Sequence, residues 1–325
     1  MIRAGIIGGA TQQAGELLRL LINHPDVELE WVHAPAQSGN LLTDFHRGMT
    51  GETFMRFIDK PALDEIDILF CCTPSAETNT FFEENEIDED LKIIVFSDDH
   101  NQKDYANEEI TDGQPLVYGF PEHNRKPLVR GAKYVANPGN IATPVLLALY
   151  PLAKNNRLFG DINATVITAA SADFAKPTSR PADSISVYKP LRHPQLEEIT
   201  TALREIQPDF EDDLLLVTIR GAFARGTIAV MHLETDLELE QIRALYEEAY
   251  IDHSFTFVLD RQPDLKDVIN TNKCLIYLDK IGSRLVVTAV TDNMIKGSAG
   301  NAVHIMNLLF GLSERTGLYL KSSSI

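Results

Sequence analysis

The chain begins with MIRAGIIGGATQQAGELLRLLI (residues 1–22), an apolar run that ends in glycine and leads into apolar residues at helical spacing. Residues 1–8 are typical of a short buried strand, and residues 14–22 of an amphipathic helix. Glycine at such a turn lets the backbone approach a pyrophosphate, whose charge meets the amide groups at the helix start. The stretch predicts the first unit of a dinucleotide-binding fold; packing alone is the alternative explanation of the glycines.

Further strands are expected at 27–32, 66–72 and 92–96, each followed by a polar loop, with helices between them. This alternation predicts an α/β domain of the Rossmann type, a parallel sheet covered by helices on both faces. Ligands of such sheets bind beyond the carboxyl ends of the strands. We therefore expect Gly8, Pro74 and Asp98 along one edge.

The pattern changes after about residue 160. Longer, partly alternating strands are expected at 162–170, 214–220, 227–233, 274–278 and 284–291, with helices at 195–206 and 238–250. These segments predict a second, α+β domain, in which an antiparallel or mixed sheet carries helices on one face. A final helix is expected at about 298–312.

Length and charge restrict the class of protein. At 325 residues the chain exceeds the size at which a single core usually splits, so two domains are expected. It has 29 basic and 47 acidic residues, and 29 − 47 = −18. This charge repels nucleic acid and anionic membrane surfaces, so neither is expected as a partner. Solubility is the simplest explanation of the acidity.

The cysteines and the hydrophobic pattern bear on the compartment. Cys71, Cys72 and Cys274 make a poor disulfide framework, which favours a reducing environment. No window approaches ~18 uninterrupted apolar residues, the length of a membrane span. The N-terminus lacks the pattern of a signal peptide. A cytoplasmic protein is expected.

Four segments resemble those of N-acetyl-gamma-glutamyl-phosphate reductases: YGFPEHNR (118–125), YVANPGNIAT (134–143), RGAFARG (220–226) and NMIKGSAG (293–300). The likeness covers nearly the whole chain. It implies a Rossmann domain at 1–141 with 299–325, and a glyceraldehyde-phosphate-dehydrogenase-like catalytic and dimerisation domain at 142–298. It also implies reduction of an N-acyl-glutamyl phosphate to the semialdehyde with NADPH, in arginine biosynthesis, by a homo-oligomer.

The resemblance also suggests cofactor-binding residues. The family has four glycines at three-residue spacing, of which Gly5 and Gly8 are kept, whereas Thr11 and Ala14 take the third and fourth positions. No acidic residue follows the second strand, and Ser38 could contact a 2′-phosphate, which favours NADP over NAD; an ordinary loop is the alternative. The candidates are Gly5, Gly8, Gly9, Ala10, Thr11, Gln12, Ser38, Pro74 and Asn293.

Asn140 stands where the family has its nucleophilic Cys. A carboxamide cannot form the thioester on which the family reaction depends. His193 keeps a family position and is the acid/base candidate, although a hydrogen-bonded surface histidine is the alternative. The substrate-binding candidates are Gln195, which replaces a second family histidine, Arg225 and Asn137, with a structural arginine as the alternative for Arg225. No metal site is expected.

Two functional hypotheses follow from these residues. The first is an NADP-dependent reductase of an N-acyl-glutamyl phosphate. The second is a catalytically silent relative that keeps the scaffold and acts as a ligand-binding, regulatory or assembly subunit. A deliberate Cys-to-Asn exchange at Asn140 is a third explanation, and the other departures from the family pattern argue against it.

Overall fold

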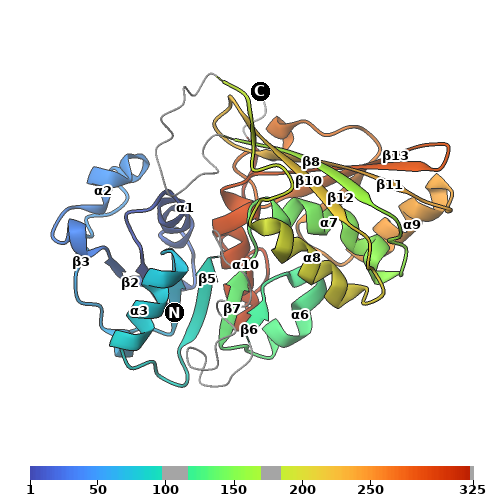
Figure 1. Cartoon of the computed structure of the whole chain (residues 1–325). Coiled ribbons are helices and arrows are strands. Elements are labelled where there is room, and N and C mark those ends of the chain that lie inside the picture. The colour runs from blue at the N-terminus through green and yellow to red at the C-terminus, as the bar shows by residue number, and fades with distance from the viewer. Residues whose placement is uncertain (97–115, 170–183, 323–325) are drawn as a thin grey trace. The chain divides into compact units, whose positions relative to one another are not determined.

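The computed structural model describes residues 1–96, 116–169 and 184–322 and divides the chain into two compact units (Figure 1). Unit 1 comprises Met1–Pro138 and Ser298–Tyr319, and unit 2 comprises Gly139–Gly297 and Leu320–Ile325. The domain boundaries expected from the sequence, 1–141 with 299–325 and 142–298, stay a prediction. They differ from the two compact units in the assignment of residues 139–141, 298 and 320–325. Asp98 lies outside the described residues.

Unit 1 contains a seven-stranded sheet in the order β3-β2-β1-β4-β5-β7-β6. All of its pairings are parallel, as predicted for a Rossmann-type domain. The near-continuous apolar runs of β1, β4 and β5 are buried, as expected for strands covered on both faces. The strands are β1 Ile2–Ile7, β2 Val27–His33, β3 Phe57–Ile58, β4 Ile68–Cys71, β5 Lys92–Phe96, β6 Leu116–Tyr118 and β7 Tyr134–Asn137.

The helices of unit 1 follow their sequence patterns to different degrees. Leu17, Leu18 and Leu21 give α1 a buried apolar face, whereas α10 is buried on every side. The predicted final helix is confirmed, but it begins later, after a π-helical turn at Ile295–Ala299. The α-helices are α1 Gln12–Leu21, α2 Leu42–Phe45, α3 Ser75–Glu84, α6 Pro121–Val129 and α10 Gly300–Leu309, with 3₁₀ turns at Pro35–Gln37, Arg47–Met49 and Leu63–Glu65.

Unit 2 contains a second seven-stranded sheet, in the order β12-β13-β14-β11-β8-β10-β9. Its β8–β10 and β12–β13 pairs are parallel and the others antiparallel, which confirms the predicted mixed sheet. The strands are β8 Ile162–Ala169, β9 Ser186–Tyr188, β10 Leu214–Gly221, β11 Thr227–Glu234, β12 Thr256–Leu259, β13 Cys274–Ile281 and β14 Arg284–Thr291.

Helices cover one face of this sheet, as predicted. Side chains on the covered face, such as Ala164, Met231 and Val287, are buried, whereas their neighbours along each strand are half-buried or exposed. The helices are α7 Ala142–Lys154, α8 Gln195–Ile206 and α9 Leu239–Tyr250, with a 3₁₀ turn at Leu265–Asp267. Among the described residues, no helix has the length and apolar character that crossing a membrane requires.

Candidate functional site

The turn after β1 lies at the point where the strand order of unit 1 reverses. From β1 the chain adds β2 and β3 on one side and then β4 and β5 on the other. Gly8 follows β1 with φ of 74°, and a Cβ there would lie 2.5 Å from the carbonyl oxygen of Cys72, which follows β4. Only glycine fits this position, and such a switch point is where parallel sheets bind ligands.

The same turn leaves the start of α1 open to an anion. Ala10 and Gln12 are exposed, whereas Gly9 is buried against Val32. The Thr11 hydroxyl accepts a hydrogen bond from the N–H of Ala14 at 3.2 Å, so it folds back onto the helix as an N-cap. The turn therefore fits a pyrophosphate despite the extra side chain at residue 11.

Gly5 has a different position from the other cofactor candidates. It lies within β1, and a Cβ there would come within 2.5 Å of the Trp31 ring. The absence of a side chain at Gly5 therefore serves the packing of Trp31, not the approach of a ligand.

The loop after β2 brings an additional basic residue to the predicted site. Ser38 is exposed and follows the 3₁₀ turn Pro35–Gln37. The Nη1 of Arg56 donates a hydrogen bond to the Gly39 carbonyl oxygen at 2.6 Å, which puts a guanidinium beside Ser38. Arg56 could not be identified from the sequence, because only the fold brings its guanidinium beside Ser38. Pro74 is exposed at the start of α3, beyond the carboxyl end of β4.

In unit 2, Asn140 lies in a buried turn at the start of α7, with 4% of its surface exposed. The Oε1 of Gln195 accepts hydrogen bonds from the N–H groups of Ile141 and Ala142, at 2.9 Å each. The Nε2 of Gln195 lies 3.5 Å from the Oδ1 of Asn140. The structure therefore brings two of the predicted site residues together, and Gln195 caps the helix that follows Asn140.

The same turn is fixed by further contacts. Glu198, one turn along α8, accepts a hydrogen bond from the N–H of Gly139 at 2.9 Å. The hydroxyl and the N–H of Thr143 both donate to the Gly139 carbonyl oxygen at 2.9 Å. A Cβ at Gly297 would lie 3.1 Å from the Cα of Asn140. Residue 140 is thus held on several sides by the backbone and by α8.

His193 adjoins this network. Its Nδ1 accepts a hydrogen bond from the N–H of Gln195 at 3.2 Å, so in the neutral ring the Nε2 carries the proton. Burial, followed by the charges of Lys189 and Arg220, lowers the pKa of His193 to about 4. His193 is therefore a neutral imidazole at pH 7, and its remaining ring nitrogen is a hydrogen-bond donor.

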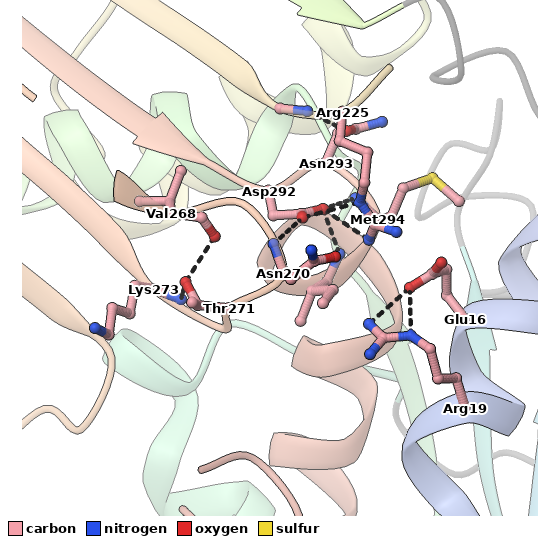
Figure 2. Close-up of polar contacts among 12 residues, drawn as sticks. Glu16, Arg19, Arg225, Val268, Asn270, Thr271, Lys273, Asp292, Asn293 and Met294 are labelled. Carbon is pink, nitrogen blue, oxygen red and sulfur yellow. Dashed lines mark hydrogen bonds and ion pairs between the residues drawn. The ribbon is translucent and has the colours of Figure 1, made fainter. Parts of the chain in front are cut away.

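Arg225 and Asn293 contact residues of their own unit (Figure 2). The Arg225 guanidinium pairs with Asp292 through Nε–Oδ2 at 3.0 Å and Nη2–Oδ1 at 3.1 Å. Asp292 is fully buried and also accepts a hydrogen bond from the N–H of Asn270 at 2.7 Å. Asn293 accepts one from the N–H of Gly226 at 2.7 Å. These contacts tie the end of β14 to the loop before β11.

Asn137 belongs to a buried network in unit 1. Its Nδ2 donates to the Ser298 carbonyl oxygen at 3.2 Å, and its Oδ1 accepts from the Nδ2 of Asn301 at 3.0 Å. Asn301 also donates to the Gly119 carbonyl oxygen at 3.0 Å. The network connects the end of β7 with the start of α10.

The cysteines offer no replacement for the missing nucleophile. Cys71, Cys72 and Cys274 are all buried, and burial raises the pKa of the Cys71 thiol far above its usual range. A buried neutral thiol is a small hydrophobic group, not a nucleophile. Among the described residues, no group of three or more His, Cys, Asp or Glu side chains could hold a metal ion.

The fold and the turn after β1 define a class of protein. Two sequence-family models match: semialdehyde dehydrogenase, NAD binding domain, at residues 3–130, and semialdehyde dehydrogenase, dimerisation domain, at residues 141–293. Aspartate semialdehyde dehydrogenase II of Vibrio cholerae, complexed with ASA, has a TM-score of 0.72 at 16% identity, over 96% of this chain and 98% of that one. The Candida albicans enzyme, solved with NADP, has a TM-score of 0.72 at 15% identity, over 95% and 98%.

Curated relatives narrow the class to a family. N-acetyl-gamma-glutamyl-phosphate reductases of Parabacteroides distasonis and Bacteroides thetaiotaomicron are each 44% identical to the chain, over 100% of both sequences. That of Christiangramia forsetii is 38% identical over 99% of both. The chain belongs to the N-acetyl-gamma-glutamyl-phosphate reductase family, as the sequence motifs indicated.

Proposed function

We propose that this chain is an NADP-binding oxidoreductase of arginine biosynthesis, whose reaction is the reduction of an N-acyl-glutamyl phosphate to the semialdehyde. The observation that carries the proposal is the 44% identity, over the full length, to relatives named N-acetyl-gamma-glutamyl-phosphate reductase. The match of residues 3–130 to an NAD binding domain supports the cofactor.

The proposed cofactor site is the turn after β1 together with the loop after β2. Gly8 and the N-terminal amides of α1 would hold the pyrophosphate, because a Cβ at Gly8 is excluded and Ala10 leaves the turn open. Ser38 and Arg56 would hold the 2′-phosphate of NADP, because a guanidinium forms paired hydrogen bonds with phosphate. The bound cofactor supplies the hydride.

Asn140 sets the expected rate. In the family reaction a Cys thiolate displaces phosphate and the resulting thioester receives the hydride. The Asn140 carboxamide has no usable lone pair for this step, and the buried Cys71 thiol is no substitute. We expect a rate about 10⁴–10⁶ below that of a Cys-containing enzyme, or about 5–8 kcal/mol of barrier.

A second function is favoured by the same residues. Asn140 and Gln195 form a network that leaves no reactive group at the family's nucleophile position. A chain with such a site would retain the scaffold without turnover. It would then act as a ligand-binding protein or as the regulatory or assembly subunit of an active relative.

The proposal includes a homo-oligomer that forms through the face of the mixed sheet opposite α7, α8 and α9. On this face the register aligns Val217 of β10, Val230 of β11 and Tyr277 of β13 in one row, each of them half-buried. Thr165 of β8 and Thr288 of β14 lie between them in the same row, and a sheet face of apolar and hydroxyl side chains is suited to contact a second copy. The match of residues 141–293 to a dimerisation domain supports this assembly.

A cofactor titration followed by an activity assay tests the proposed function. Trp31 is the only tryptophan of the chain and packs on Gly5 in β1, so its fluorescence reports on the sheet that carries the cofactor turn. We expect NADPH to change this fluorescence at micromolar concentrations, and slow phosphate-dependent reduction of NADP by an N-acylglutamate semialdehyde. Binding without turnover would favour the second function. Absence of both NADPH binding and turnover would contradict the reductase and favour a subunit that keeps only the scaffold.

A further inference from the structure

We infer that Gln195 is a positioning residue that closes the site at Asn140, because its carboxamide occupies the two backbone amides that would otherwise stabilise negative charge there. The inference rests on the proposed location of the site at residue 140, but not on cofactor binding or turnover. Asn140 and Gln195 therefore form one coupled unit, and exchange of Asn140 alone does not restore a reactive group.

The first step is the geometry of the amides. The N–H groups of Ile141 and Ala142 are among the first of α7, and such groups have no carbonyl partner within their own helix. They are the natural donors to a thiolate or an oxyanion at residue 140. Both donate to the Oε1 of Gln195 at 2.9 Å, so their hydrogen-bonding capacity is already used.

The second step is the confinement of the carboxamide. Gln195 is 7% exposed, and a Cβ at Gly139 would lie 2.2–2.6 Å from its Cδ, Oε1 and Nε2 atoms. The Nε2 lies 3.5 Å from the Oδ1 of Asn140, and the N–H of Gln195 donates to the Nδ1 of His193 at 3.2 Å. The Gln195 side chain is therefore packed directly on the turn that it caps. A ligand could reach the two amides only if this side chain were displaced.

The third step concerns the chemistry at residue 140. A thiol becomes a thiolate near neutral pH when amide groups or positive charges stabilise it. If Gln195 retains the two amides, a Cys placed at position 140 finds these donors occupied by a neutral oxygen. Its pKa should then not fall below the usual value, whereas removal of the Gln195 acceptor should lower it relative to Asn140→Cys alone.

The experiment compares the pKa of the thiol introduced by Asn140→Cys in chains with Gln195 and with Gln195→Ala. The pKa is obtained from the pH dependence of alkylation by iodoacetamide. The unaltered chain serves as the blank, because it contains the three natural cysteines. We expect Asn140→Cys/Gln195→Ala to have a thiol pKa at least about one unit below that of Asn140→Cys, which is about tenfold more thiolate near pH 7. Gln195→Met in place of Gln195→Ala removes the acceptor but retains the volume, in case the alanine variant does not fold.

Gln207 provides the matched control. It is a second buried glutamine, just beyond the end of α8, whose Oε1 accepts from the N–H of Leu158 at 3.1 Å and whose Nε2 donates to the Leu158 carbonyl oxygen at 2.9 Å. Gln207→Met in the Asn140→Cys background should leave the thiol pKa unchanged. The inference is overturned if Asn140→Cys alone has the lowered pKa, if neither Gln195 variant lowers it, or if Gln207→Met lowers it equally.

Discussion

The guanidinium of Arg225 lies across the carboxylate of Asp292 and forms two hydrogen bonds with it, at 3.0 and 3.1 Å (Figure 2). Asp292 is fully buried, and its Oδ1 also accepts from the N–H of Met294 at 2.8 Å. A buried carboxylate needs such partners because its desolvation is unfavourable. Arg225 was a substrate-binding candidate with a structural arginine as the alternative, and this bidentate pair is a contact within its own unit.

Arg225→Gln should therefore lower the free energy of unfolding by about 3 kcal/mol, because it leaves a buried carboxylate without its counter-charge. Urea unfolding followed by circular dichroism measures the change. Arg243→Gln is the control, because Arg243 pairs at 2.8 Å with Asp260, whose side chain is 96% exposed, and should cost less than about 1 kcal/mol. Equal effects of the two variants would contradict a structural role for Arg225.

Gly8→Ala should both destabilise the chain and abolish NADPH binding. The φ of 74° at Gly8 disfavours any residue with a side chain, and the Cβ of the alanine would clash with the Cys72 carbonyl oxygen. Gly160→Ala is the control, because its φ is 67° but no atom lies within 4 Å of its Cβ position. We expect about 1–3 kcal/mol more destabilisation at Gly8 than at Gly160. A Gly8→Ala chain that binds NADPH normally would show that the cofactor turn lies elsewhere.

Arg56→Gln should weaken NADPH binding about tenfold and leave NADH binding unchanged, because only NADPH carries a 2′-phosphate for a guanidinium beside Ser38. Fluorescence titration of the same preparations with each cofactor gives the two dissociation constants. Arg47→Gln, another exposed arginine of unit 1, should change neither. Equal loss of NADPH and NADH affinity in Arg56→Gln would argue for a general electrostatic effect.

His193 should make the chain less stable in mild acid. Its folded pKa of about 4 lies below the usual 6.5, so between these values the unfolded chain takes up a proton that the folded chain does not. The free energy of unfolding should therefore fall as pH decreases through this window, by about 3 kcal/mol in total. His193→Gln removes this contribution. The free energies of unfolding measured with urea at pH 7 and at pH 4.5 should therefore differ less in this variant than in the unaltered chain. An unchanged difference would contradict the lowered pKa.

Val230→Lys should disrupt the proposed homo-oligomer, because it places a charge in the centre of the sheet face opposite α7, α8 and α9. Sedimentation velocity should give a smaller species for this variant than for the unaltered chain. Glu240→Lys, at an exposed position of α9 on the other side of the sheet, should retain the assembly. An unaltered chain that sediments as a monomer would remove the basis of the proposal.

Elements with a distinct periodicity or an apolar run bounded by turns could be predicted from the sequence. Expected strands at 27–32 and 92–96 correspond to β2 and β5, and the helix at 195–206 matches α8. α7 was not predicted, since twelve of its residues from Ala142 to Ala153 are buried and it has no polar face to give a helical period. β3 is only two residues long, too short for a pattern.

The candidate site could be located from sequence in part. The motifs placed Asn140, Gln195 and His193 in one site, and the structure brings these three together. The role of Gln195 as a cap on α7 could not be predicted, because a hydrogen bond across 53 residues depends on the packing of α7 and α8. Arg56 could not be predicted as a cofactor-binding residue for the same reason. It reaches Gly39 only because the loop after β2 pairs with the segment before β3.

Intact-mass spectrometry of the acid-quenched chain tests the central claim most directly. The purified chain is mixed with NADP and an N-acylglutamate semialdehyde, the pair from which a nucleophilic residue 140 would form an acyl-enzyme. With Asn140 at this position and every cysteine buried, the account predicts that the chain keeps its unmodified mass. A mass increase equal to the acyl group would contradict it.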